Sequence, residues 1–108
     1  MIHISWSTTA FSMLESLPRK TAFEILDRTD KLSAFPELGV SLKHLYPRLG
    51  NCRQLIFKRQ YRLVYLYEAD NREIRILMLQ RCRQQLPTNA DLHRTIKEIE
   101  LADQEDHS

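Results

Sequence analysis

Three short apolar runs in the second half of the chain dominate its pattern of hydrophobic and polar positions. They span Cys52–Phe57, Tyr61–Tyr67 and Ile74–Leu79, and each is rich in β-branched, aromatic or aliphatic residues. Short polar links, residues 58–60 and 69–72, join them. Because tight polar links between such runs are typical of hairpins, the pattern predicts a three-stranded antiparallel meander.

The N-terminal third combines strand and helix patterns. Apolar and polar residues alternate over residues 2–6, which predicts a short strand at the edge of the sheet. Residues 7–9 offer N-cap side chains, and apolar residues then follow helical spacing until Pro18, which ends one helix and suits the first turn of the next. Phe35-Pro36 ends the second helix, so the pattern predicts a helical hairpin whose apolar stripe covers a sheet.

Polar and breaker residues mark the remaining segments. Residues 36–50 contain two prolines and two glycines and are predicted to form a basic loop. Pro87 stops the last strand, and Thr88 or Asn89 can cap a short closing helix. The last stretch, residues 100–108, is acidic and poor in apolar residues, so we expect a flexible tail there.

Together these elements predict one α+β domain over residues 1–108: an N-terminal strand, a two-helix hairpin, a three-stranded antiparallel meander and a short C-terminal helix. A length of 108 residues with 43% hydrophobic residues allows one sheet with a helical layer. Residues 1–6 do not resemble a signal peptide, and no stretch approaches the roughly 20 apolar residues of a membrane span. Two cysteines suit a reducing compartment, so we expect a cytoplasmic protein.

The net charge of +2 hides a strong partition. Residues 1–42 carry 4 basic and 5 acidic side chains, residues 43–83 carry 10 and 3, and residues 84–108 carry 2 and 6. The predicted sheet therefore lies in a segment of net charge +7, which indicates a polyanion or an acidic partner. Arginines that are merely solvated at strand edges are the plainer alternative.

The register of the meander decides which arginines share a face, since side chains alternate along a strand. With Asp70-Asn71 as a two-residue turn, Arg62 pairs with Leu79. Arg81 is then the diagonal neighbour of Arg62 on the same, open side of the sheet, and Arg83 continues that face. This register predicts one cluster of guanidinium groups.

The length of the first turn decides the side of Arg53. If Arg59-Gln60 is the turn, Arg53 shares the face of Arg62, whereas a three-residue turn moves it to the other side. In the first register Cys52 and Cys82 both lie on the helix-covered side, about 9–10 Å apart. That distance exceeds disulfide reach, so both are predicted to be core thiols.

Arginines on an open sheet face are suited to phosphate. Guanidinium groups bind phosphate oxygens through paired hydrogen bonds and keep their charge at neutral pH. They can stabilise the charge that grows at a scissile phosphodiester but are poor general bases, and RNA supplies its own nucleophile, the 2′-hydroxyl group. A docking surface for an acidic peptide is the alternative. No two histidines lie at metal-ligand spacing, so we expect no metal or other cofactor.

The order of these features resembles that of the RelE/ParE superfamily of bacterial toxin–antitoxin toxins. The resemblance covers nearly the whole chain to about Gln85. It rests on the strand ending at Trp6, the two-helix hairpin, Phe35-Pro36 with a Leu-rich basic loop, and the segments Cys52-Arg53-Gln54-Leu55, Tyr61-Arg62-Leu63-Val64-Tyr65 and Ile76-Leu77-Met78-Leu79-Gln80-Arg81-Cys82-Arg83. The Tyr-Arg-hydrophobic-Val-Tyr strand, followed by a strand with an arginine-rich end, is the most specific part.

The resemblance implies a small cytoplasmic toxin that a cognate antitoxin holds inactive. In the RelE branch such proteins enter the ribosomal A site and cut mRNA, an endoribonuclease activity that inhibits translation. Arg62 matches a family arginine that contacts phosphate, Arg81 one that stabilises transition-state charge, and Arg53 a basic position on the preceding strand. These three are the predicted catalytic residues. The predicted nucleic-acid contacts are Lys43, Arg48, Lys58, Arg59 and Arg83.

The segment after the last strand departs from the RelE pattern. RelE-like toxins often carry a tyrosine, or a histidine–tyrosine pair, where this chain has Gln84, Gln85, Leu86 and Pro87. Residues 83–88 look more like the HigB branch, which also cuts RNA. ParE-like members lack those residues too and inhibit DNA gyrase without being enzymes. A gyrase inhibitor and a degenerate member that only binds its antitoxin are therefore the two alternatives.

Overall fold

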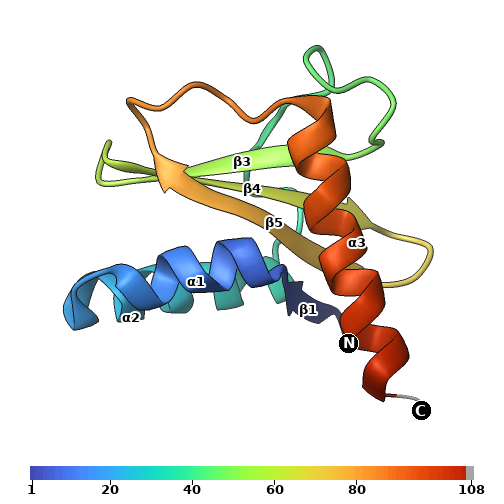
Figure 1. Ribbon diagram of the computed structural model, residues 1–108, viewed down its shortest axis with the longest axis horizontal. Helices are drawn as coiled ribbons and strands as arrows, with labels where there is room; N and C mark the ends of the chain where they lie inside the picture. Colours follow the sequence, from blue (N-terminus) through green and yellow to red (C-terminus); the bar gives the residue numbers. More distant parts are fainter. Residues whose placement is uncertain (107–108) are drawn as a thin grey trace.

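The chain folds as a five-stranded sheet with helices on both faces. The structure, a computed structural model, describes residues 1–106 (Figure 1). Its elements are β1 (His3–Trp6), α1 (Thr8–Ser16), α2 (Arg19–Asp30), the 3-10 helix η1 (Lys31–Ser33), β2 (Val40–Ser41), β3 (Cys52–Phe57), β4 (Tyr61–Glu68), β5 (Glu73–Arg81) and α3 (Asn89–Asp106). The predicted α+β class is confirmed.

The strand order β1-β5-β4-β3-β2 places the predicted meander at the centre of the sheet. β3, β4 and β5 pair antiparallel, and β1 joins β5 in parallel at the edge, where we expected it. The strand β2, only two residues long, pairs with β3 inside the predicted loop 36–50. Two residues are too few for an alternating pattern to signal a strand.

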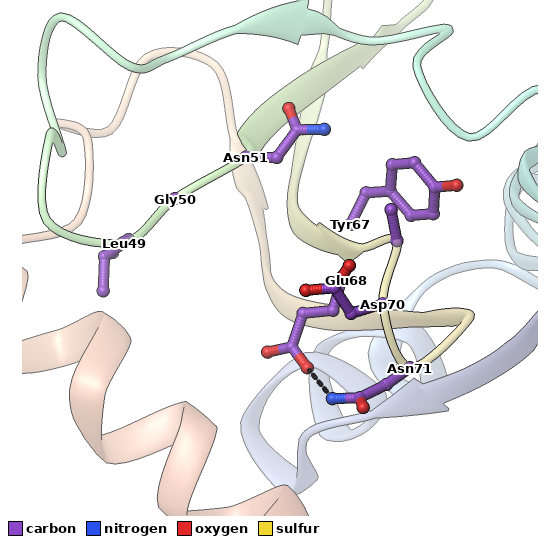
Figure 2. A pocket seen from close by; sticks show the side chains of 8 residues that line it. Leu49, Gly50, Asn51, Tyr67, Glu68, Asp70 and Asn71 are labelled. Atoms are coloured by element: carbon purple, nitrogen blue, oxygen red, sulfur yellow. Dashed lines mark hydrogen bonds between the residues drawn. The ribbon is translucent and has the colours of Figure 1, made fainter.

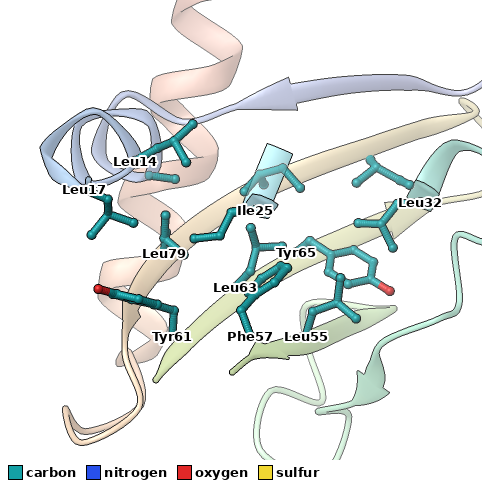
Figure 3. Packing of buried hydrophobic residues seen from close by; sticks show 13 residues of the cluster. Leu14, Leu17, Ile25, Leu32, Leu55, Phe57, Tyr61, Leu63, Tyr65 and Leu79 are labelled. Atoms are coloured by element: carbon teal, nitrogen blue, oxygen red, sulfur yellow. The ribbon is translucent and has the colours of Figure 1, made fainter. Parts of the chain in front are cut away.

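The hairpin of α1 and α2 covers one face of the sheet. Figure 3 shows Leu14, Ile25 and Leu32 packed toward Leu63 and Tyr65 of β4. All five are buried. Because burying an aliphatic side chain of this size contributes roughly 1.5–3 kcal/mol, these contacts hold the hairpin firmly on this face.

The helix α3 covers the opposite face of the sheet (Figure 1). Leu92 and Ile99 pack against Val64, Leu66 and Leu77. With 18 residues α3 is not the short helix predicted from the sequence. The sparse apolar residues after Ile99 hid its length, because a helix can continue on helix-forming polar residues such as glutamate.

Both ends of α3 bear on the sequence predictions. Thr88 is the cap: its Oγ1 accepts a bond from the Asp91 N–H at 3.0 Å, and Asp91 Oδ2 accepts one from the Thr88 N–H at 3.1 Å. The helix reaches Asp106, so the described part of the tail 100–108 is helical, while residues 107–108 lie outside the described residues. The flexibility of this tail stays a prediction. No helix within residues 1–106 is long and apolar enough to cross a membrane.

A β-bulge in β5 divides the β4–β5 pairing into two registers. Near the turn the predicted register is confirmed, with Tyr65 opposite Ile76. Beyond the irregularity Val64 faces Met78 and Arg62 faces Gln80, so Leu77 is the extra residue. The predicted pairing of Arg62 with Leu79 is therefore wrong by one residue. One residue of shift is enough to move Arg81 to the other side of the sheet.

Two contacts explain why the bulge is stable. Leu77 is fully buried in the core under α3, and Met78 packs against the same cluster, so the bulge lets consecutive apolar side chains serve one core. The carbonyl oxygen of Leu77 accepts a bond of 2.8 Å from Ser7 Oγ. Ser7 is also the N-cap of α1, where its Oγ accepts from the Ala10 N–H.

The link between β3 and β4 has three residues. Phe57 pairs with Tyr61, and Lys58 and Arg59 take positive φ angles of 51° and 59°. The three-residue turn considered above is therefore confirmed. It places Arg53 on the face of the sheet that the helical hairpin covers, whereas Arg62 lies on the other face.

The two cysteines are free thiols. Cys52 packs in the core under α3, so its predicted place on the hairpin side is wrong, because the longer first turn changes the side of every β3 residue. Burial raises the pKa of the Cys52 thiol to about 12. Cys82 is only partly buried.

Candidate nucleic-acid interface

The guanidinium group of Arg62 is held between side chains of the two strands that flank β4. It projects from β4 on the α3 side, between Gln54 of β3 and Gln80 of β5. Its Nε donates to Gln54 Oε1 at 2.9 Å, and its Nη1 donates to Gln80 Oε1 at 2.8 Å. A longer bond of 3.4 Å joins Nη1 to the carbonyl oxygen of Gln84. The guanidinium group is therefore held in a defined orientation at the end of the sheet.

All of these partners are uncharged. Within the described residues Arg62 forms no ion pair with a carboxylate, so its positive charge is not neutralised locally. A partly buried guanidinium group with neutral acceptors keeps its attraction for an incoming anion. A side chain that binds phosphate needs this property.

Arg81 belongs to a different surface. A hollow of about 260 Å³ is lined by Arg59, Gln60, Arg81, Cys82 and Arg83. The guanidinium carbon of Arg81 lies 5.5 Å from the ring centre of Tyr61, a cation–π contact on the hairpin side. The predicted cluster of Arg62 and Arg81 on one open face is therefore wrong, because the bulge separates them.

The turn after β5 nevertheless brings the two surfaces close together. Gln84 Oε1 accepts the backbone N–H of Arg81 at 2.9 Å, while the Gln84 carbonyl oxygen lies against Arg62. Arg59, Arg62, Arg81 and Arg83 thus surround one end of the β3–β4–β5 meander, from both of its sides. We call this region the basic end of the sheet.

Arg53 does not reach the basic end of the sheet. Its guanidinium group donates to Asn51 Oδ1 at 2.7 Å and to the Gly39 carbonyl oxygen at 2.7 Å, and it forms an ion pair of 3.0 Å with Glu37. Its side chain is 17% exposed. The three-residue first turn therefore separates Arg53 from Arg62, the second of the two outcomes considered, and these contacts give Arg53 a structural role in holding the turn before β2.

The same turn depends on Gly39 and Tyr65. The Tyr65 hydroxyl donates to the Pro36 carbonyl oxygen at 2.8 Å and accepts the Gly39 N–H at 2.9 Å. A Cβ atom at Gly39 would lie 2.7 Å from the Gln54 carbonyl oxygen and 2.8 Å from the Tyr65 ring. Burial raises the pKa of Tyr65, so its hydroxyl group stays protonated and available to donate.

The other predicted contacts are dispersed. Lys58 is exposed but forms an ion pair with Glu24 of α2. Lys43 borders a hollow beside Arg53, and Arg48 borders another near the start of α3. Neither hollow includes a residue of the basic end.

Within the described residues, the groups that hydrogen-bond to Arg62 are two carboxamides and a backbone carbonyl, none of which is a base at neutral pH. Burial raises the pKa of Tyr46, although the charge of Arg62 acts to lower it. Its hydroxyl group donates to the Pro87 carbonyl oxygen at 2.6 Å, so it is committed to holding the segment before α3. The described residues around Arg62 therefore supply charge and hydrogen bonds at this end of the sheet.

The opposite end of the sheet has a different chemistry. A hollow of about 410 Å³ lies between residues 49–51 and the β4–β5 turn (Figure 2). Glu68 and Asp70 line it, and Glu68 accepts a bond from Asn71 Nδ2 at 3.3 Å. Carboxylates repel phosphate, so this larger hollow is a poor place for a nucleic-acid backbone.

The glutamines were the residues that sequence reasoning missed. Gln54 and Gln80 are each flanked by strand residues, and Gln80 follows an uninterrupted apolar run from Ile76 to Leu79. A carboxamide at the end of a buried strand signals a buried hydrogen bond, since such groups are rarely left unsatisfied. That signal could have identified Gln80 as a partner, but not Arg62 as the group it binds.

Comparison with solved structures gives the fold its relatives. The chain is similar to a chain in the crystal structure of the intact E. coli RelBE toxin–antitoxin complex, with a TM-score of 0.61. The alignment covers 78% of this chain and 100% of that chain. The chain has a RelE-like fold. At 12% sequence identity the likeness establishes the RelE-like fold alone. No protein-family model and no curated protein matches the sequence.

Proposed function

We propose that this chain is the toxin of a bacterial toxin–antitoxin system and that it inhibits translation by cutting mRNA on the ribosome in the cytoplasm. The RelE-like fold supports a toxin, since the solved structure that it resembles is a toxin–antitoxin complex. A cognate antitoxin protein is the implied partner. The observation that supports the RNA part concerns the guanidinium group of Arg62. Within the described residues it hydrogen-bonds only to uncharged oxygen atoms, so its positive charge is not neutralised.

In this proposal Arg62 binds the phosphoryl oxygens of the scissile phosphodiester. The hollow lined by Arg59, Arg81 and Arg83 binds the neighbouring phosphates, so the RNA passes around the end of the sheet. Chemistry then rests on positioning and charge stabilisation, with the 2′-hydroxyl group of the RNA as nucleophile. Attack of the 2′ oxygen on phosphorus breaks the bond to the 5′ oxygen, which leaves with a proton from water, and in this proposal the ribosome supplies the base that accepts the proton of the 2′-hydroxyl group.

Induced expression in bacteria tests the proposal. The unmodified chain should stop growth and leave cut mRNA, mapped by primer extension, while Arg62→Ala should remove both effects. Arg94→Ala is the matched control, because Arg94 is an exposed arginine on α3 whose ion pair is with Asp91. Cuts that persist in Arg62→Ala, or arrest without any cuts, would contradict an endonuclease that uses Arg62.

A non-enzymatic inhibitor of DNA gyrase is the second candidate. The absence of a proton acceptor beside Arg62 within the described residues favours it. It predicts a DNA-damage response and loss of supercoiling activity on expression, with mRNA intact. The same induced cultures therefore separate the two candidates, and expression without any effect would indicate a chain that only binds its antitoxin.

A further inference from the structure

We propose that Gln54 and Gln80 are positioning residues for Arg62, which orient its guanidinium group and leave its positive charge available to an RNA phosphate. The inference rests on the proposed function. It concerns the two carboxamides that this chain places beside the arginine.

The geometry restricts the guanidinium group in two directions. Bonds of 2.9 Å from Nε and 2.8 Å from Nη1 reach acceptors on the two strands that flank β4. Two bonds to one planar group stop its rotation, and Nη2 makes no hydrogen bond within the described residues. A free arginine side chain carries about 2 kcal/mol of rotamer entropy. Because the two hydrogen bonds already restrict Arg62, less conformational entropy is lost when an anion binds.

Gln80 is itself oriented by a second bond. Its Nε2 donates to the Gln85 carbonyl oxygen at 3.2 Å, and the residue is only 8% exposed. Because the amide nitrogen faces that carbonyl, the amide oxygen must face Arg62. The orientation of Gln80, and through it that of Arg62, therefore depends on the turn after β5 as well as on the strands.

A carboxylate would hold the guanidinium group equally well but would neutralise it. Arg53 and Arg75 show this alternative within the same sheet, since each forms ion pairs with glutamate. Glutamine has the same acceptor geometry as glutamate without the charge. The choice of amide over carboxylate is what keeps Arg62 attractive to phosphate.

Binding of a single-stranded RNA oligonucleotide to the purified chain, measured by fluorescence anisotropy over a range of salt concentrations, tests the inference. Gln54→Glu should weaken RNA binding roughly 10- to 100-fold and lower the salt slope by about one, as Arg62→Ala should. Gln54→Met removes the acceptor without adding charge, so it should weaken binding less and keep the slope. Gln104→Glu adds the same charge on the exposed end of α3 and is the control.

Each outcome decides something. If Gln54→Glu binds RNA with the affinity and slope of Gln104→Glu while Arg62→Ala is weakened, the positioning inference is wrong and the proposed function stands. If Gln54→Met lowers the slope as much as Gln54→Glu, the glutamine has only a structural role. If Arg62→Ala binds normally, the RNA part of the proposed function fails.

Thermal unfolding confirms that each variant is folded. Arg62→Lys keeps the charge but cannot reach both glutamines, so it should weaken RNA binding and leave the salt slope unchanged.

Discussion

Arg62 and Arg75 lie on the same face of the sheet, at opposite ends, and their surroundings differ in charge. Arg75 pairs across the sheet with Leu66, and its guanidinium group lies 3.8 Å from Glu68, 3.4 Å from Glu73 and 3.6 Å from Glu100. Arg62 contacts two glutamine oxygens and a carbonyl oxygen. Within the described residues, Arg75 lies beside three carboxylates, whereas Arg62 forms no ion pair with a carboxylate.

The difference separates a structural arginine from a functional candidate. Because Glu100 belongs to α3, Arg75 ties that helix to β5, and its charge is used within the fold. The net charge of +7 counted along residues 43–83 treats both arginines alike. The partners of each arginine, more than the number of arginines, decide which of them keeps a positive charge that is not neutralised within the fold.

The largest expected effect is on stability and comes from removing the Ser7 hydroxyl group, which holds the β-bulge in β5. This bulge places Gln80 opposite Arg62. Ser7→Ala removes the α1 cap and leaves the Leu77 carbonyl oxygen without its 2.8 Å partner. A lost cap and a buried unsatisfied acceptor together should lower the free energy of unfolding by about 2–4 kcal/mol. Urea titration measures this. Ser16→Ala, at an exposed serine, is the control, and equal midpoints for the two variants would show that the bulge does not need Ser7.

A smaller effect on stability should follow when the neutralised arginine is removed. Arg75→Ala leaves three carboxylates close together and removes the ion pair between β5 and α3, which should lower the free energy of unfolding by about 1–2 kcal/mol. Differential scanning calorimetry at low and high salt should show a loss that shrinks as salt rises. Arg62→Ala, with neutral partners, should lack that salt dependence. The same behaviour in both variants would remove the distinction between the two ends.

The smallest effect concerns the N-terminal end of α3, where the Asp91 carboxylate accepts a hydrogen bond from the backbone N–H of the cap residue Thr88. Hydrogen bonds from Thr88 hold the pKa of Asp91 below its ordinary value. The carboxylate therefore stabilises the fold above its unfolded pKa, and this contribution is lost as pH falls through the lower, folded pKa. Unfolding midpoints between pH 7 and pH 2 should fall less steeply in Asp91→Asn than in the unmodified chain. Parallel curves would contradict the cap as a source of acid sensitivity.

The order of the elements could be predicted because each has a local pattern. Alternation marks β1, Pro18 separates α1 from α2, and polar links separate β3, β4 and β5. The relative faces of the arginines could not be predicted beyond the bulge. Leu77, Met78 and Leu79 are all apolar, so no alternation shows which of them is the extra residue.

The hydrogen-bond and ion-pair partners of the arginines also could not be predicted from the sequence pattern. Glu37 and Gly39 reach Arg53 through a turn that Tyr65 holds from another strand, and Glu100 reaches Arg75 from the far end of α3. Contacts between residues so distant in sequence depend on the packed fold. The charge of a segment could be read from the sequence, but not the part of it that ion pairs use.

RNA affinity measured against salt concentration for Arg62→Ala and Arg75→Ala compares the two ends in one experiment. If Arg62 is the phosphate ligand, its removal should lower the salt slope by about one and weaken binding, whereas Arg75→Ala should leave slope and affinity unchanged at a temperature where it is folded. Equal losses in the two variants, or a loss only in Arg75→Ala, would contradict the account.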